Sequence, residues 1–180
     1  MKKQKNMKAL RRMGGLILSV TLCTSILGGC NGSNNQVENT GYEVWSTYNT
    51  RKIIQNPSDN SIYDKLPAKL SIQMMKDETE GAQLVITANE DIDSFSLTAS
   101  ELSDGKGNTI PVNSIDIFQQ KYVEIVKMHS TNKEIKAGNY VPDMLLPMEK
   151  AIEYKENKVK EGNNQGLTIE ITTSSETVPR

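Results

Sequence analysis

Residues 167–172 read Leu167-Thr168-Ile169-Glu170-Ile171-Thr172, a strict alternation of one apolar and one polar side chain. Successive side chains of a β-strand point to opposite faces. The alternation therefore places three aliphatic side chains on one face and three polar side chains on the other. This pattern predicts a strand with one face packed on a core and the other face toward water.

The same period of two recurs along much of the chain, fully or in part, at 42–48, 70–74, 83–88, 94–99 and 115–117. Turn-forming sequences lie between several of these stretches, at 77–81 (DETEG), 103–108 (SDGKGN) and 162–166 (GNNQG). Glycine and Asp-Gly tolerate the positive φ that tight turns require. Repeated strands and turns at this spacing predict an all-β domain, an antiparallel β-sandwich of the immunoglobulin-like or jelly-roll-like kind, over residues 42–180.

A helix is an open alternative only at 147–160, where Glu and Lys are common. Its apolar positions are Met148, Ile152 and Val159, which are too sparse to define one buried helical face. The sequence shows no internal repeat.

The first 29 residues are typical of a bacterial lipoprotein signal peptide. Six Lys and Arg residues and no acid precede an apolar or small stretch at 14–27, which is shorter than the roughly 20 apolar residues that span a bilayer. Leu27-Gly28-Gly29-Cys30 then resembles the lipobox, in which the Cys thiol accepts a diacylglycerol. We therefore expect Cys30 to be the lipid attachment site. The alternatives are an ordinary signal peptide with a chance Cys and an uncleaved anchor.

Residues 30–41 are expected to be the acylated Cys followed by a flexible tether. The stretch 31–41 (NGSNNQVENTG) is polar and rich in Asn and Gly, so it cannot bury enough apolar surface to offset the entropy of ordering it. Such a tether reaches about 18 Å on average. The sequence thus predicts a domain that is exported and held by lipid at the bacterial cell membrane, facing outside.

Charge and residue usage exclude several other classes of protein. The leader carries six of the 21 basic residues, so the remainder has 15 basic and 22 acidic residues, a net charge of −7. Nucleic-acid binding needs clustered Lys and Arg, so no nucleic-acid partner is expected. Cys23 leaves with the leader and Cys30 is acylated, so no disulfide is expected. His129 is the only histidine, and the sequence predicts no metal site and no cofactor.

Three stretches of the mature part resemble the N-terminal β-sandwich domain of glycoside hydrolase family 123 and its relatives with domain of unknown function 4091. Residues 80–86 (EGAQLVI) are similar to a Glu-x-x-Gln-apolar-apolar segment. Residues 138–147 (GNYVPDMLLP) are similar to a Gly-x-Tyr-Pro-Asp-x-Leu-Leu-Pro segment, with Val141 as an extra residue. Residues 162–165 (GNNQ) precede a strand and Val178-Pro179, although the Trp that often follows in relatives is replaced by Gly166-Leu167.

This resemblance implies a non-catalytic N-terminal module of a surface-anchored glycosidase. In the family a (β/α) barrel follows the sandwich and does the chemistry, and characterised members resemble β-N-acetylgalactosaminidases that use the substrate's 2-acetamido group as nucleophile, supported by an adjacent Asp-Glu pair in the barrel. The expected partners are that barrel, the membrane and a glycan. The chain reaches only Arg180, so we expect no catalytic residue in it and a sandwich that lacks its last strand. The pair Asp77-Glu78 is interpreted as a solvated turn.

A stand-alone carbohydrate-binding or adhesive lipoprotein is the alternative function. Sugars stack on exposed aromatic rings, so the candidate binding residues are Trp45 and Tyr140, together with Tyr42, Tyr48 and Tyr122. Packing in a core or an interface is the competing interpretation, favoured for Trp45 because several of the aromatics alternate with apolar neighbours. A third hypothesis is a decayed fragment of a longer gene.

Overall fold

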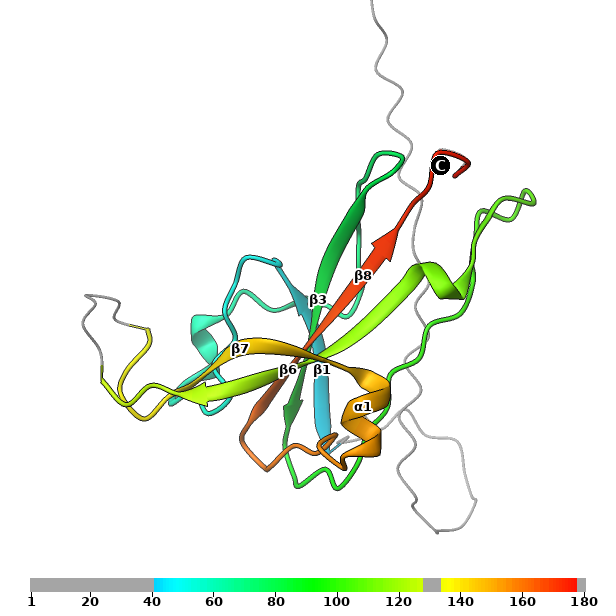
Figure 1. Ribbon diagram of the computed structural model, residues 1–180. Coiled ribbons are helices and arrows are strands. Elements are labelled where there is room, and N and C mark those ends of the chain that lie inside the picture. The colour runs from blue at the N-terminus through cyan, green and yellow to red at the C-terminus, as the bar shows by residue number, and fades with distance from the viewer. Residues whose placement is uncertain (1–40, 128–133, 178–180) are drawn as a thin grey trace, which may run out of the picture.

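The computed structural model describes residues 41–127 and 134–177 (Figure 1). The expected signal peptide, Cys30, nearly all of the tether and His129 lie outside the described residues. Within the described ranges, no helix has the length and apolar character needed to cross a membrane.

The described residues form one six-stranded antiparallel sheet and one short hairpin. The sheet has the order β2-β1-β3-β8-β6-β7, with bounds β1 Tyr42–Thr47, β2 Leu66–Pro67, β3 Thr79–Ala88, β6 Ile115–Glu124, β7 Tyr140–Pro147 and β8 Asn164–Thr172. The hairpin pairs β4 (Leu102–Ser103) with β5 (Thr109–Ile110). One α-helix, α1 (Met148–Glu153), and two 3-10 turns, η1 (Asn60–Ile62) and η2 (Val112–Ser114), complete the elements.

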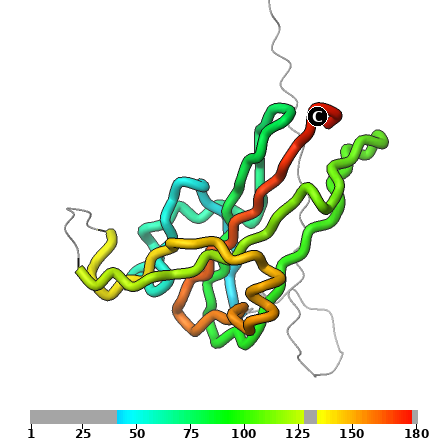
Figure 2. The backbone as a smooth tube through the Cα atoms, viewed as in Figure 1, coloured from blue at the N-terminus to red at the C-terminus, as the bar shows by residue number. Residues whose placement is uncertain are grey.

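Strand β8 lies at the centre of the sheet although it is the last described strand of the chain. It pairs with β3 along nine residues, from Thr79↔Thr172 to Thr87↔Asn164, and with β6 from Ile115↔Ile171 to Gln119↔Leu167. Figure 2 shows this strand, coloured orange to red, running between the two green strands. The sheet is therefore held together by contacts between residues that are far apart in the sequence.

The predicted alternation builds the core. Leu84 and Ile86 of β3 lie on the same face as Leu167 and Ile169 of β8, because Leu84 pairs directly with Leu167. We call this the core face. All four side chains are at most 2% exposed, which places them in the main hydrophobic cluster. Burying one such side chain stabilises a fold by about 1.5–3 kcal/mol.

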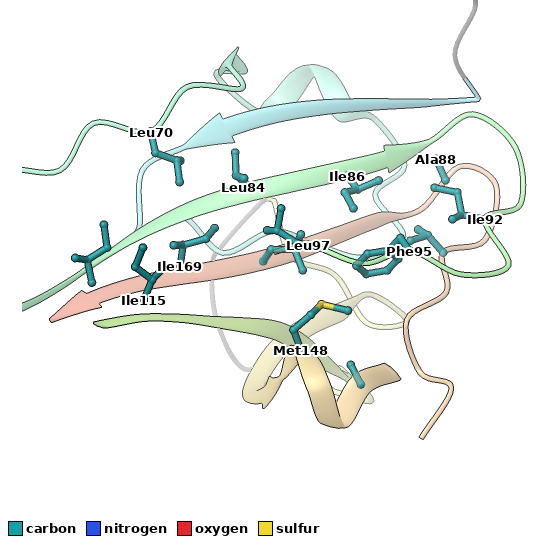
Figure 3. Packing of buried hydrophobic residues seen from close by; sticks show 14 of the residues in the cluster. Leu70, Leu84, Ile86, Ala88, Ile92, Phe95, Leu97, Ile115, Met148 and Ile169 are labelled. Carbon is teal, nitrogen blue, oxygen red and sulfur yellow. The ribbon is translucent and has the colours of Figure 1, made fainter. Parts of the chain in front are cut away.

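The layer that covers the core face is made mostly of extended segments. Figure 3 shows Leu70, Phe95 and Leu97 packed against the sheet, with Met148 of α1 closing one side. The prediction of strands at 70–74 and 94–99 was wrong, because neither segment belongs to a strand. The alternation in these segments reflects the burial of one face. The segments are not strands, because no neighbouring strand provides the backbone hydrogen bonds of a ladder.

The expected fold class is confirmed. The described residues are all-β and sandwich-like, and their sheets do not close into a barrel. The helix considered at 147–160 is limited to the six residues of α1, of which Met148 and Ala151 are buried. Asp77 has a φ of 57°, and Gly105, Gly107 and Gly162 also have positive φ, so tight turns form at or beside the three predicted turn sequences.

The second face of the sheet carries a smaller apolar cluster of Trp45, Ile53, Tyr63 and Val85. A chain of buried hydrogen bonds lies beside it: Trp45 Nε1 donates to Thr87 Oγ1 (2.9 Å), and Thr87 Oγ1 donates to Asn164 Oδ1 (2.7 Å). Asn164 Nδ2 then donates to the Ile54 carbonyl (3.2 Å). This chain ties three strands to the loop after β1.

Candidate functional site

The candidate site forms where β6 separates from β8. The ladder between them ends at Gln119↔Leu167, whereas β6 continues beside β7 as far as Glu124↔Tyr140 (Figure 1). In the widened space, hydrogen bonds made by side chains replace the backbone hydrogen bonds of the ladder. Gln165 Nε2 donates to the carbonyl of Gln120 (2.8 Å), and the Gly166 N–H donates to Tyr122 Oη (2.8 Å).

The opening is a polar groove of about 320 Å³, which we call the β6–β8 slot. This volume is at the lower end of the range for small-ligand sites. The slot is lined by residues from the loop after β1, from β6, β7 and β8, and from the segment between α1 and β8: Gln55, Gln119, Gln120, Lys121, Tyr122, Tyr140, Lys155, Glu156, Lys158 and Gln165. Amide, hydroxyl, ammonium and carboxylate groups therefore meet in one place.

Two glutamines of the slot are held by their amide nitrogens alone. Gln119 Nε2 donates to the Glu156 carbonyl (2.9 Å), and Gln120 Nε2 donates to Gln83 Oε1 (2.6 Å) across the second face. Gln119 is 2% exposed and Gln120 is 6% exposed. Within the described residues, the Oε1 atom of each is buried without a hydrogen-bond partner. Buried acceptors are normally paired, so two neighbouring exceptions mark this as an unusual place in the fold.

The slot is positively charged within an acidic domain. Lys121 forms an ion pair with Glu156. Lys155 and Lys158 also line the slot, and neither forms an ion pair with any residue in 41–127 or 134–177. The three Lys and one Glu give the lining a charge of +2, whereas the described residues together have 13 basic and 21 acidic side chains, a net charge of −8.

The two tyrosines of the slot have different environments. Burial raises the pKa of the Tyr122 hydroxyl well above its ordinary value of 10, so this group stays protonated at neutral pH. Tyr140 is 37% exposed, and its hydroxyl lies 3.5 Å from a carboxylate oxygen of Glu124. The backbone of Tyr140 is fixed, because its carbonyl accepts from the Gln55 N–H (2.8 Å).

The structure separates the two carbohydrate-binding candidates. Trp45 is 2% exposed and packs on Tyr63 with ring centroids 5.6 Å apart, so its ring face is not open to a sugar and the packing interpretation is confirmed. Tyr140 lies in the slot, and its binding role stays a prediction. Tyr122 lies in the slot as well, whereas Tyr48 is 67% exposed and lies outside it.

Sequence reasoning did not select the glutamines and lysines of the slot. A signal was present in 119–122 (QQKY), four consecutive polar or amphipathic residues within a strand. Such a run is unexpected beside a buried centre strand, and it marks the point at which the ladder ends.

The adjacent carboxylates have structural roles, as expected for turns. Asp77 has positive φ in the turn before β3, and Glu78 Oε2 accepts from the Met75 N–H (2.5 Å). Asp91 accepts from Lys160 Nζ (2.6 Å), and this hydrogen bond is the main reason that its pKa is lowered. Asp77, Glu78 and Asp91 thus lie in loops outside the slot.

Comparisons with known proteins give no assignment. No protein-family model matches the chain, and no curated protein matches it. No group of three or more metal-ligating side chains occurs within the described part of the chain.

Proposed function

We propose that residues 42–180 are a non-catalytic β-sandwich module of an exported, lipid-anchored glycosidase of the family 123 kind, beside a catalytic (β/α) barrel. The motifs at 80–86, 138–147 and 162–165 support this proposal. The observation that carries it is the composition of the slot. Glu156 is the one carboxylate among the described residues that line it, and this carboxylate is ion-paired with Lys121.

This composition suits binding better than hydrolysis. Most glycosidases place two carboxylates about 5–10 Å apart, with one acting as acid. A general acid also needs a raised pKa, and neither Asp59 nor Asp91, the carboxyls with a shifted pKa in the described ranges, has one: hydrogen bonds from Ser61 and Lys160, respectively, lower both.

Hydrolysis by the chain itself is tested with an aryl β-N-acetylgalactosaminide. We expect no release of the aryl alcohol by the full chain. Turnover that Asp77→Asn or Glu78→Gln abolishes would refute the non-catalytic role, because these two residues form an adjacent Asp-Glu pair.

A stand-alone carbohydrate-binding lipoprotein is the second candidate, and the slot is the observation that favours it. Tyrosine rings, amides and charged groups in one groove are typical of sugar sites, where a few polar groups fix orientation. Glycan-array binding that Tyr140→Ala abolishes and Tyr48→Ala preserves would support this candidate. Because Tyr48 is more exposed than Tyr140 and lies outside the slot, it is the matched control.

Lipid anchoring at Cys30 is tested by labelling cells with radioactive palmitate. We expect the full chain to incorporate label, Cys30→Ala to lose it, and Cys23→Ala to retain it, because Cys23 lies within the leader. Equal labelling of the Cys30 variant and the unchanged chain would reject the anchor.

A further inference from the structure

We propose that the β6–β8 slot binds an anionic sugar, with its acidic group beside Lys155 and Lys158 and its hydroxyls toward the polar groups that line the groove. That the ligand is a sugar rests on the proposed function. That it is anionic, and that it binds in this groove, rests on the charges and hydrogen-bonding groups described above.

The slot differs in charge from the rest of the domain. A domain of net charge −8 repels anions at long range, yet the slot lining has a charge of +2. Lys155 and Lys158 come from one short segment, in which Lys155 is held in a turn at a φ of 56°. Such a local concentration of cations in a groove attracts a ligand of opposite charge.

The slot contains hydrogen-bonding groups that have no partner among the described residues. The Oε1 atoms of Gln119 and Gln120 are acceptors of this kind, but both are too deeply buried to touch solvent and they belong to consecutive strand residues, whose side chains point to opposite faces. A sugar hydroxyl therefore reaches one of them only after that side chain rotates toward the groove. Tyr122 Oη accepts from the Gly166 N–H, and no acceptor for its own hydrogen is found in the described part of the chain. A hydroxylated ligand can satisfy these buried groups only by rearranging them, and its direct contacts in the slot are with exposed groups such as Tyr140, Lys155 and Lys158.

The two ends of the slot give the ligand a direction. Glu124 lies beside the Tyr140 hydroxyl, so an acidic group at that end would be repelled. Lys155 and Lys158 flank Glu156, whose carbonyl accepts from Gln119 Nε2, so these lysines lie near the Gln119 end of the slot and away from Glu124. An acidic sugar thus fits with its carboxylate toward Lys155 and Lys158 and an uncharged C–H face toward the half-exposed ring of Tyr140.

The test is a calorimetric titration of the full chain, in detergent micelles at low salt, with glucuronate, glucose and acetate in turn. Glucuronate and glucose differ mainly in one carboxylate, and acetate carries the carboxylate without the hydroxyls. We expect glucuronate to bind about tenfold or more tightly than either other probe, because charge-assisted hydrogen bonds are stronger than neutral ones. Raising the salt concentration should weaken glucuronate binding.

The matched variants are the double substitution Lys155→Gln/Lys158→Gln and the control Lys106→Gln, an exposed lysine in the β4–β5 loop. We expect the double variant to lose at least about tenfold in glucuronate affinity, and the control to retain it. Unfolding curves of all three proteins should coincide, since neither slot lysine makes an ion pair within the described residues.

Each contrary outcome refutes one part of the proposal. Equal binding of glucose and glucuronate refutes the preference for an anion. Equal binding of acetate and glucuronate refutes the sugar. Absence of binding by all three probes refutes the site, and it leaves the non-catalytic module standing because that proposal is tested by hydrolysis.

Discussion

Replacing Thr87 by valine should destabilise the fold far more than the loss of a single hydrogen bond from the surface. Valine has nearly the shape of threonine but cannot accept from Trp45 Nε1 or donate to Asn164 Oδ1. Trp45 is 2% exposed and Asn164 is 0% exposed, so water cannot replace the missing partner of either group. The substitution thus leaves two buried polar groups unpaired at once.

The expected cost follows from these two groups. Each buried donor or acceptor left without a partner costs about 1–3 kcal/mol, so Thr87→Val should lower the free energy of unfolding by about 2–6 kcal/mol. Domains of this size have total stabilities of about 5–15 kcal/mol. The loss is therefore a large fraction of the total, and it should move the urea midpoint by about 1–3 M.

Urea unfolding followed by Trp45 fluorescence gives the measurement, with Thr98→Val as the control because Thr98 is exposed. In a Trp45→Phe background, Thr87→Val should lower the free energy of unfolding by less, because the indole N–H that would lose its acceptor is absent. Circular dichroism replaces fluorescence in that background. A Thr87→Val midpoint within about 0.3 M of the unchanged protein would refute the reasoning.

Two further predictions test the region around the slot. Gly166→Ala should lower the free energy of unfolding by about 1–3 kcal/mol, because the added Cβ would lie 2.1 Å from Gln120 Oε1 in a buried site. Gly81→Ala should lower it less in the same urea assay, because the one close approach of its Cβ is to the exposed Asn49 amide (2.8 Å). Equal losses in the two variants would count against this explanation. Burial raises the pKa of Tyr122 above 10, so the stability due to its neutral hydroxyl is present below that pH and is lost as the pH rises above it. The free energy of unfolding should therefore fall from pH 9 to pH 11, and the fall should be smaller in Tyr122→Phe.

Alternation allowed the faces of the strands to be predicted, because it is a local property of the chain. Leu84 and Ile86, and likewise Leu167 and Ile169, lie on the core face as the period of two requires. Alternation carries no information on which strands become neighbours. The central position of β8 depends on pairing between residues far apart in the sequence, and no local pattern specifies it.

The two wrong strand predictions have one cause. At 70–74 and 94–99 the apolar side chains face the core, as Leu70, Phe95 and Leu97 do. A strand also needs a neighbour whose backbone completes the ladder, and that neighbour is a tertiary feature. The pattern could report burial at these positions, but it could not report hydrogen bonding.

The candidate site was predicted least well, for a related reason. Tyr140 was selected because aromatic rings bind sugars, and Trp45 was selected by the same criterion although its neighbours favour packing. The slot exists only because β6 and β8 separate after Gln119↔Leu167, and Lys155, Lys158 and Tyr122 all line it. A sequence gives the kinds of side chain, but the place where two strands separate is decided by the whole sheet.

The late position of β8 in the chain has a consequence for biogenesis. As the polypeptide leaves the ribosome, the strands of the six-stranded sheet within residues 42–147 can form only two separate groups, one around β1 and β3 and one from β6 and β7. Residues 164–172 join them, so the sheet cannot close until nearly all of the described chain has been synthesised. Long-range closure of this kind is slow. For the export that we propose, such a delay keeps the polypeptide unfolded and competent for translocation through a narrow secretion channel.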